Sequence, residues 1–200
     1  MVIDGAKALH KAVRDVLGVH TPVQRCVRHK ERNVLAHLPE RDRPLVRRRL
    51  RAAWALDDHD RALDRLRGLA DELARSHPGA AASLREGMEE TLTVTRLGVR
   101  GRLKQTLAST NPCESMIETV RRVARNVKHW SNGDMCLRWT AAGMLEAERQ
   151  FRRIIGHTDL AKLALAVERD VAARRATHTP TTTFHPPVAT AAPEVAASPV

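Results

Sequence analysis

The 200-residue chain has very few aromatic side chains: three tryptophans, two phenylalanines and no tyrosine. Because aromatic and β-branched residues fill sandwiches and barrels, this composition argues against a large β-fold. Alanine, leucine and arginine are abundant instead and favour helices. With 42% hydrophobic residues, the chain can still form a buried core. We therefore expect a mostly α-helical protein.

Cysteines and long apolar runs are also scarce. The three cysteines are widely spaced and do not make a disulfide framework. No apolar run approaches the length of a membrane span, and no signal-peptide pattern opens the chain. We therefore expect a soluble, cytoplasmic protein without a membrane partner.

Acidic residues are outnumbered, with 23 Asp and Glu against 34 Lys and Arg, a formal charge of +11. Such a balance implies a polyanionic partner, nucleic acid before an anionic membrane surface. Residues 25–51 hold ten basic and three acidic side chains, including the run Arg47, Arg48 and Arg49. Most charge runs are only a solvated helix face. Phosphate contacts, which give affinity and salt dependence rather than sequence choice, explain this one equally well.

The opening of the chain has an α/β pattern. Residues 1–5 resemble the end of a buried strand, residues 6–17 have helical spacing, and residues 22–27 are a short strand candidate. This order predicts strand, helix, strand, with a parallel pair. Asp4 follows the first strand, where it either caps the helix or has a functional role. Residues 35–97 are predicted to form an all-helical block.

Residues 109–128 are predicted to form one helix, with Asn111 as its N-cap and Pro112 at its first position. An apolar stripe, which we expect to be buried, consists of Met116, Ile117, Val120, Val123, Ala124 and Val127. The opposite side carries Glu114, Glu118, Arg121, Arg125 and Lys128. A carboxylate above a row of cations suits a metal-bound phosphodiester. Alternatively, Glu114 completes a capping box and only satisfies a backbone N–H.

The C-terminal part continues as helix and then changes composition. Residues 134–155 are apolar nearly all round, which predicts a buried helix. Residues 160–171 form a last short helix. Residues 176–200 hold five of the ten prolines and one acid, so we expect a disordered tail there.

Cys26 and His29 place a thiol and an imidazole three residues apart. Structural zinc sites need four such ligands in paired spacing, and Cys113 and Cys136 have no nearby partner of that kind. The spacing therefore does not favour a zinc site. A Cys–His nucleophile pair is not favoured either, because no third orienting group can be named.

Three segments, taken together and in order, resemble the mutator-type transposases of bacterial insertion sequences. They are VIDGAKAL at residues 2–9, VQRCVRHKERNVL at residues 23–35 and STNPCESMIETVRR at residues 109–122. The resemblance extends from about Val2 to Asp170. The Cys-x-x-His and T-N-x-x-E-S elements in this order are far more specific than either alone.

The resemblance implies an incomplete ribonuclease H-like core with an all-helical insertion. On this basis residues 1–34 are part of the core, residues 35–108 the insertion and residues 109–175 the core helices that carry Glu114. Residues 176–200 would be the tail. The fold class expected is thus mostly α with a small α/β part.

The resemblance also implies a DDE chemistry, in which two Asp and one Glu hold two Mg²⁺ or Mn²⁺ ions for cleavage and joining of DNA strands. Asp4 matches the second aspartate and Glu114 the glutamate. Cys26 and His29 match a motif that supports the insertion or the site, and Asn111 would shape the glutamate helix.

The implied partners are transposon terminal repeats and target DNA, bound by a homo-oligomer on the bacterial nucleoid. The basic residues expected to contact DNA are Arg47, Arg48, Arg49, Arg121, Arg122, Arg125 and Lys128.

The first aspartate of the family lies upstream of the second, and this sequence starts just before the second. We therefore expect the two-metal site to be incomplete and the chain alone to be inactive. The alternative function is a non-catalytic DNA-binding remnant, or an inhibitor that pairs with full-length transposase.

Overall fold

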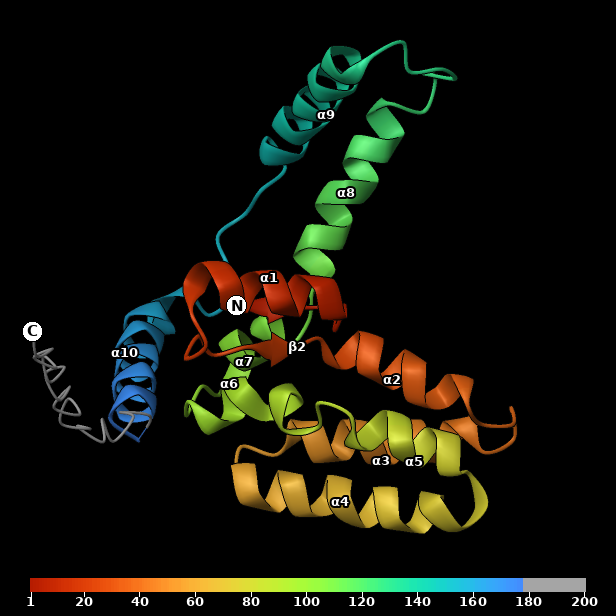
Figure 1. The fold of residues 1–200 in the computed structure, drawn as a ribbon, viewed down its shortest axis with the longest axis vertical. Coiled ribbons are helices and arrows are strands. Elements are labelled where there is room, and N and C mark those ends of the chain that lie inside the picture. Colours follow the sequence, from red (N-terminus) through yellow and green to blue (C-terminus); the bar gives the residue numbers. More distant parts are fainter. Residues whose placement is uncertain (178–200) are drawn as a thin grey trace, which may run out of the picture.

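The computed structural model describes residues 1–177 (Figure 1). This part is mostly helical, as predicted, and its two strands are two residues long each. Within these residues, no helix combines the length and the apolar character that a membrane crossing requires.

The chain opens with the predicted strand, helix and strand. Strand β1 (Val2–Ile3) pairs in parallel with β2 (Gln24–Arg25), so that Val2 faces Gln24. Helix α1 (Lys7–Leu17) connects the strands and ends at Gly18, whose φ of +90° an L-residue rarely adopts. The core of this unit is small and consists of Ile3, Val13 and Val23. A sheet of two strands this short is not stable by itself and depends on packing against neighbouring elements.

The largest core lies among four helices. They are α2 (Val27–Ala36), α3 (Arg43–Ala55), α4 (His59–Ser76) and α5 (Pro78–Arg85). Leu50, Leu66 and Leu84 are fully buried where these helices pack together. Figure 1 shows this helical layer on the side of the molecule opposite α8. The cluster also includes Val34 of α2, so α2 packs as part of this layer.

A buried lysine joins α2 to the C-terminal end of α5. Lys30 Nζ donates hydrogen bonds to the carbonyl oxygens of Ser83 at 2.7 Å and Glu86 at 2.5 Å. Burial, and then the neighbouring Arg25, lower the pKa of Lys30. Because the last carbonyls of a helix lack intrahelical partners, this ammonium group satisfies atoms that would otherwise be orphaned.

The α/β unit is fixed to the following segment by Gln24. Its amide nitrogen donates to the carbonyl oxygen of Thr91, and its amide oxygen accepts from the backbone N–H of Val94, at 2.8 and 2.9 Å. These residues belong to η1 (Glu89–Leu92) and α6 (Thr93–Arg96). The chain then continues through α7 (Gly101–Leu107) to the second half of the described residues.

Helices α8 (Asn111–Val123) and α9 (Gly133–Glu148) pack side by side as a hairpin that projects from the rest of the molecule (Figure 1). The chain returns through η2 (His157–Asp159) to α10 (Leu160–Thr177). Leu163 of α10 packs against a small core around Leu103 of α7.

The burial predicted for α8 and α9 is wrong. No residue of α8 is fully buried, although its stripe is half-buried against α9 apart from exposed Ile117. On α9 only Gly143 and Ala147 are buried, and Leu137 remains 68% exposed. The reason is geometric: among the described residues the hairpin helices pack mainly on each other, and one neighbour covers only one face of an apolar helix.

The predicted cap of α8 is also wrong. Thr110 is the N-cap, and Asn111 is the first helical residue, with Pro112 at the second position. Both Thr110 and Asn111 are residue types that cap helices, so the sequence pattern could not choose between them. The Thr110 hydroxyl donates to the Glu114 carboxylate instead of accepting from a backbone N–H.

Three helix ends differ from those predicted. Helix α8 stops at Val123 rather than at residue 128, where the hydrogen bond from Arg125 N to Arg122 O tightens the last turn. Helix α9 stops at Glu148, before residue 155. Helix α10 extends to Thr177, so residues 176 and 177 of the predicted tail are helical. The remainder of that tail lies outside the described residues.

We predict that Gly143→Ala destabilises the hairpin. A Cβ atom at Gly143 would lie 2.7 Å from Val120 Cα, a backbone atom that cannot move away without shifting α8. The expected cost is about 1–3 kcal/mol in the free energy of unfolding, measured by denaturant titration. Gly68→Ala is the matched control, because Gly68 lies inside α4 with nothing within 4 Å of an added Cβ. The control should gain about 0.5–1 kcal/mol. Equal stability of both variants would contradict the packing of α8 on α9.

Candidate metal and nucleic-acid site

The turn that begins α2 and the turn that begins α8 contact each other directly. The backbone N–H of Val27 donates to the carbonyl oxygen of Ala108 at 2.9 Å. The backbone N–H of Thr110 donates to Cys26 Sγ at 3.4 Å. These two contacts bring segments more than 80 residues apart in the sequence into one place.

The Thr110 hydroxyl lies at the centre of this junction. It donates to Glu114 Oε1 at 2.6 Å and lies 3.4 Å from His29 Nδ1. His29 Nδ1 is itself 3.7 Å from Glu114 Oε1. The Glu114 side chain is 46% exposed and that of His29 is 23% exposed, so a solute can reach both.

Cys26 forms the floor of the junction and is fully buried. Burial alone would raise the pKa of its thiol. Hydrogen bonds from the side chain and backbone of Thr110 and of His29 outweigh that effect, and the pKa of Cys26 is lowered. The cysteine is therefore more easily deprotonated than an ordinary buried thiol.

Cys26, His29 and Glu114 each offer a ligand atom, and these atoms all lie within 4.8 Å of one another. Within residues 1–177 this is the one such group of three or more His, Cys, Asp or Glu side chains. It contains a single carboxylate. The structure thus brings together three of the residues singled out from the sequence, although they come from two separate motifs.

Asp4 is not a member of this group. It is exposed, and its Oδ1 accepts a hydrogen bond from the backbone N–H of Ala6 at 2.9 Å. Ala6, not Asp4, is the N-cap of α1, so the alternative in which Asp4 caps this helix is wrong. Asp4 instead stabilises the turn between β1 and α1.

Residues 1–154 match a family model described as "Transposase, Mutator family". The chain belongs to this transposase family. It is 31% identical over 118 residues to the transposase for insertion sequence element IS6120 of Mycolicibacterium smegmatis, which covers 59% of this chain and 36% of that protein. It is 33% identical over 148 residues to the transposase for insertion sequence element ISRM5 of Rhizobium meliloti (strain 1021). This match covers 71% of this chain and 37% of that protein. The chain therefore spans little more than a third of each relative, and no solved structure matches it.

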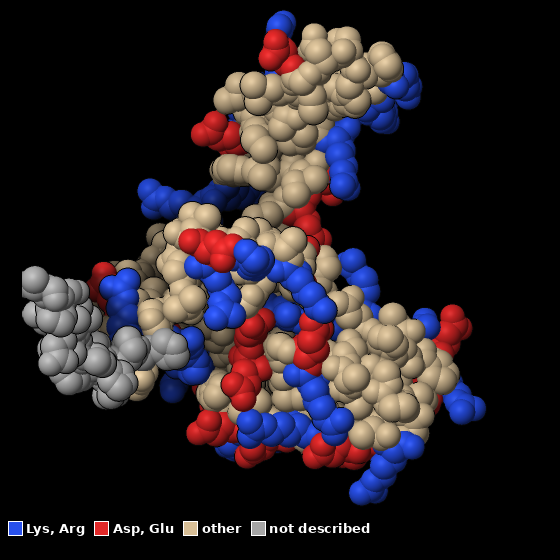
Figure 2. Space-filling view, in the orientation of Figure 1, with Lys and Arg blue, Asp and Glu red and all other residues tan. Residues whose placement is uncertain are grey.

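In this member of the Mutator family, the basic residues of the hairpin are available to a ligand. Arg121, Arg122 and Arg125 are exposed, and none forms an ion pair with a described residue. Among the described residues, Lys128 Nζ makes a polar contact only with the carbonyl oxygen of Arg125, at 3.4 Å. Figure 2 shows basic side chains on the α8 side of the hairpin.

The arginine run of α3 differs from the hairpin because two of its three members are already paired. Arg47 Nε lies 3.4 Å from Glu31, and Arg49 binds both carboxylate oxygens of Glu72. The hydrogen bonds that Arg49 donates to Glu72 raise the pKa of Arg49. Arg48 is exposed and forms no ion pair within the described part of the chain. Of the run, Arg48 is the residue most free to contact phosphate.

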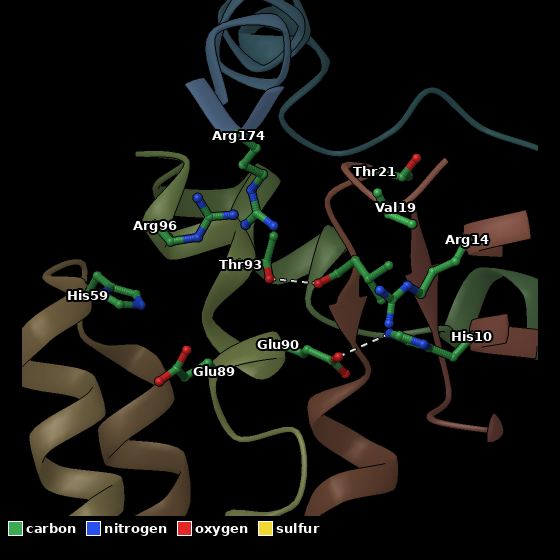
Figure 3. Close-up of a pocket in the computed structure, with 11 residues that line it drawn as sticks. His10, Arg14, Val19, Thr21, His59, Glu89, Glu90, Thr93, Arg96 and Arg174 are labelled. Carbon is green, nitrogen blue, oxygen red and sulfur yellow. Dashed lines mark hydrogen bonds and ion pairs between the residues drawn. The ribbon is translucent and has the colours of Figure 1, made fainter. Parts of the chain in front are cut away.

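A polar cavity of about 330 Å³ lies apart from these residues, between α1, η1, α6 and α10 (Figure 3). His10 Nε2 is 3.1 Å from Glu90 in its wall, and Arg174 Nε is 2.9 Å from Asp170. Asp170 also pairs with Arg96. No residue that the sequence singled out lines this cavity, and no motif could have indicated it, because its walls come from both ends of the chain. Most of its charged side chains have ion-pair partners in the wall or beside it, so it is a polar joint between elements.

We predict that Asp170 stabilises the attachment of α10 in a pH-dependent way. Burial would raise the pKa of this carboxyl, but hydrogen bonds and charge from Arg96 and Arg174 outweigh it and lower the pKa. A lowered native pKa gives a contribution that is present above the unfolded pKa of about 3.9 and is lost as the pH falls through the native value. Asp170→Asn should cost about 1–2 kcal/mol near pH 7, measured by denaturant unfolding.

The same variant should differ little from wild type at a pH below the native pKa of Asp170, where both side chains are neutral. Asp159→Asn is the control, since the one ion pair of Asp159 within the described residues is with exposed Lys162 three residues away. If Asp170→Asn lowered the free energy of unfolding by the same amount at every pH, the effect would not come from the ion pairs.

Proposed function

We propose that the chain is part of a transposase that cuts and joins DNA strands, with Glu114 and Asp4 as carboxylates of a metal-dependent site. The observation that carries the proposal is the Mutator family match over residues 1–154, which include both residues. The order of the elements adds support. A parallel strand–helix–strand unit, a helical layer and then a helix headed by a glutamate is the arrangement expected of a ribonuclease H-like core with an insertion.

Glu114 has the chemistry to bind Mg²⁺ or Mn²⁺. Its Oε1 accepts from Thr110, and its Oε2 has no hydrogen-bond partner among the described residues. A carboxylate with a free oxygen suits these oxygen-preferring cations. Its neighbours are a thiol and an imidazole, however, and Asp4 lies outside the group. The described residues therefore do not assemble an all-oxygen two-metal site, and we infer that the chain alone does not cleave DNA.

The second candidate function is DNA binding without catalysis, as a remnant or as an inhibitor that pairs with full-length transposase. The exposed arginines on the α8 side of the hairpin, which have no ion-pair partner among residues 1–177, support it. Exposed Leu137 and Leu145 on α9 support association with further protein, because apolar side chains of this size gain free energy when they are covered. Both functions need DNA contacts, and only the first needs Glu114.

We predict that the chain binds duplex DNA through the hairpin, with strong salt dependence and little sequence preference. The triple variant Arg121→Gln, Arg122→Gln, Arg125→Gln should weaken binding. It should also reduce the slope of log affinity against log salt by about 2.7, because each lost phosphate contact removes about 0.9. Fluorescence anisotropy over a salt series measures both quantities. Arg85→Gln is the control, since Arg85 is paired with Asp71 on a different face.

Salt-insensitive binding, or equal losses in the triple variant and in Arg85→Gln, would contradict hairpin binding. Among Arg47, Arg48 and Arg49, we expect Arg48→Gln to reduce the slope most, because Arg48 alone has no acidic partner among residues 1–177.

Cleavage of transposon-end DNA separates the two functions. We expect the purified chain to produce no cut product with Mg²⁺ or Mn²⁺. Cleavage that is lost in Glu114→Gln and retained in Cys136→Ser would show that the chain is catalytic by itself, against our inference. Cys136 is an exposed residue of α9 and serves as the matched control for a site-specific loss.

A further inference from the structure

The group formed by Cys26, His29 and Glu114 has a donor chemistry that the proposed oxygen-ligand site does not use. A thiol, an imidazole and a carboxylate converge from the first turns of two helices, α2 and α8. Mg²⁺ and Mn²⁺ prefer oxygen ligands, whereas thiolate and imidazole ligands select zinc and similar borderline-soft cations. The set thus matches a different metal from the one that the family chemistry implies.

The spacing of the group also fits zinc. Zinc bonds to sulfur, nitrogen and oxygen are about 2.0–2.3 Å long, so tetrahedral ligands lie about 3.3–3.8 Å from each other. His29 Nδ1 and Glu114 Oε1 are already 3.7 Å apart. The other pairs lie within 4.8 Å, so shifts of about 1 Å or less complete the geometry. Rotation of the exposed Glu114 side chain supplies such a shift for the Cys26–Glu114 pair, and rotation of the His29 imidazole supplies it for the Cys26–His29 pair.

The positions of the three residues allow a metal to enter. Cys26 is fully buried at the floor of the junction, while Glu114 lies 46% exposed at its mouth. Three protein ligands with an open fourth position are typical of zinc sites that bind water or a further ligand. The Thr110 hydroxyl lies 2.6 Å from Glu114 and 3.4 Å from His29, so it can orient both side chains toward a metal.

We propose that Cys26, His29 and Glu114 form a three-ligand site for Zn²⁺, with Co²⁺ as its spectroscopic substitute. The ligands come from two separate segments, so the site can exist only when the α2 turn and the α8 turn are held together. Its existence does not depend on the proposed DNA chemistry, because binding is read without any DNA. A zinc ion bound there would occupy Glu114 and withhold it from other cations.

The test is a titration of the full 200-residue chain, freed of metal, with Co²⁺ alone. We expect one equivalent to bind, with a thiolate-to-cobalt charge-transfer band and the visible bands of tetrahedral Co²⁺. Zn²⁺ should then displace it, because the same donor set binds Zn²⁺ more tightly than Co²⁺. Cys26→Ser should abolish the charge-transfer band. Glu114→Gln removes a direct ligand and should weaken Co²⁺ binding by more than the about 10–100-fold that loss of an outer-shell partner costs.

Cys136→Ser is the matched control and should bind Co²⁺ like the wild type. Glu114 is half-exposed, so Glu114→Gln keeps the test decisive even if replacement of buried Cys26 unfolds the chain; circular dichroism checks helix content in each variant. Absence of a charge-transfer band in wild type would overturn the proposal. Loss of the band in Cys136→Ser, or unchanged affinity in Glu114→Gln, would overturn it as well.

Discussion

The contact between the Cys26 turn and the Thr110 turn is the constraint on which the arrangement of the site depends. Helix α8 belongs to a hairpin that projects from the molecule, so little other packing fixes its first turn. One backbone bond to Ala108 and one bond to a buried sulfur hold that turn against α2. The Thr110 hydroxyl then donates a hydrogen bond to the Glu114 carboxylate and fixes its position. The glutamate is thereby placed by residues about 80 positions earlier in the chain.

The hairpin of α8 and α9 has apolar side chains that no described residue covers. Its two helices pack closely on each other, and the absence of a side chain at Gly143 lets α9 approach Val120. The outer leucines of α9 are exposed, although the helix is apolar nearly all round. An apolar helix that packs on only one neighbour retains surface that favours association. The α8 side of the same hairpin carries arginines without an ion-pair partner in the described part of the chain. One projecting element therefore combines the surface proposed to contact protein with the surface proposed to contact phosphate.

Local patterns predicted much of the fold and only part of the site. Helical spacing and the Asp4–Gly5 turn gave the parallel strand–helix–strand opening correctly, because these features depend on neighbouring residues. The sequence argument against a zinc site considered only cysteines and histidines. It could not show that Glu114, 85 residues beyond His29, lies beside the Cys26–His29 pair. Burial of α9 was predicted wrongly for a related reason. Periodicity shows that a face is apolar, but the partner that would cover it is a tertiary property.

The measurement that most directly tests the junction is amide hydrogen exchange at Thr110 and Val27, whose N–H groups make the two connecting bonds. We predict that both amides exchange as slowly as the interior amides of α2, because they open only when that layer opens. We also predict that Cys26→Ala accelerates exchange at Thr110 and leaves the interior of α4 unchanged. Exchange at Thr110 as fast as in an exposed loop, unaffected by Cys26→Ala, would show that the α2 turn does not hold the head of α8.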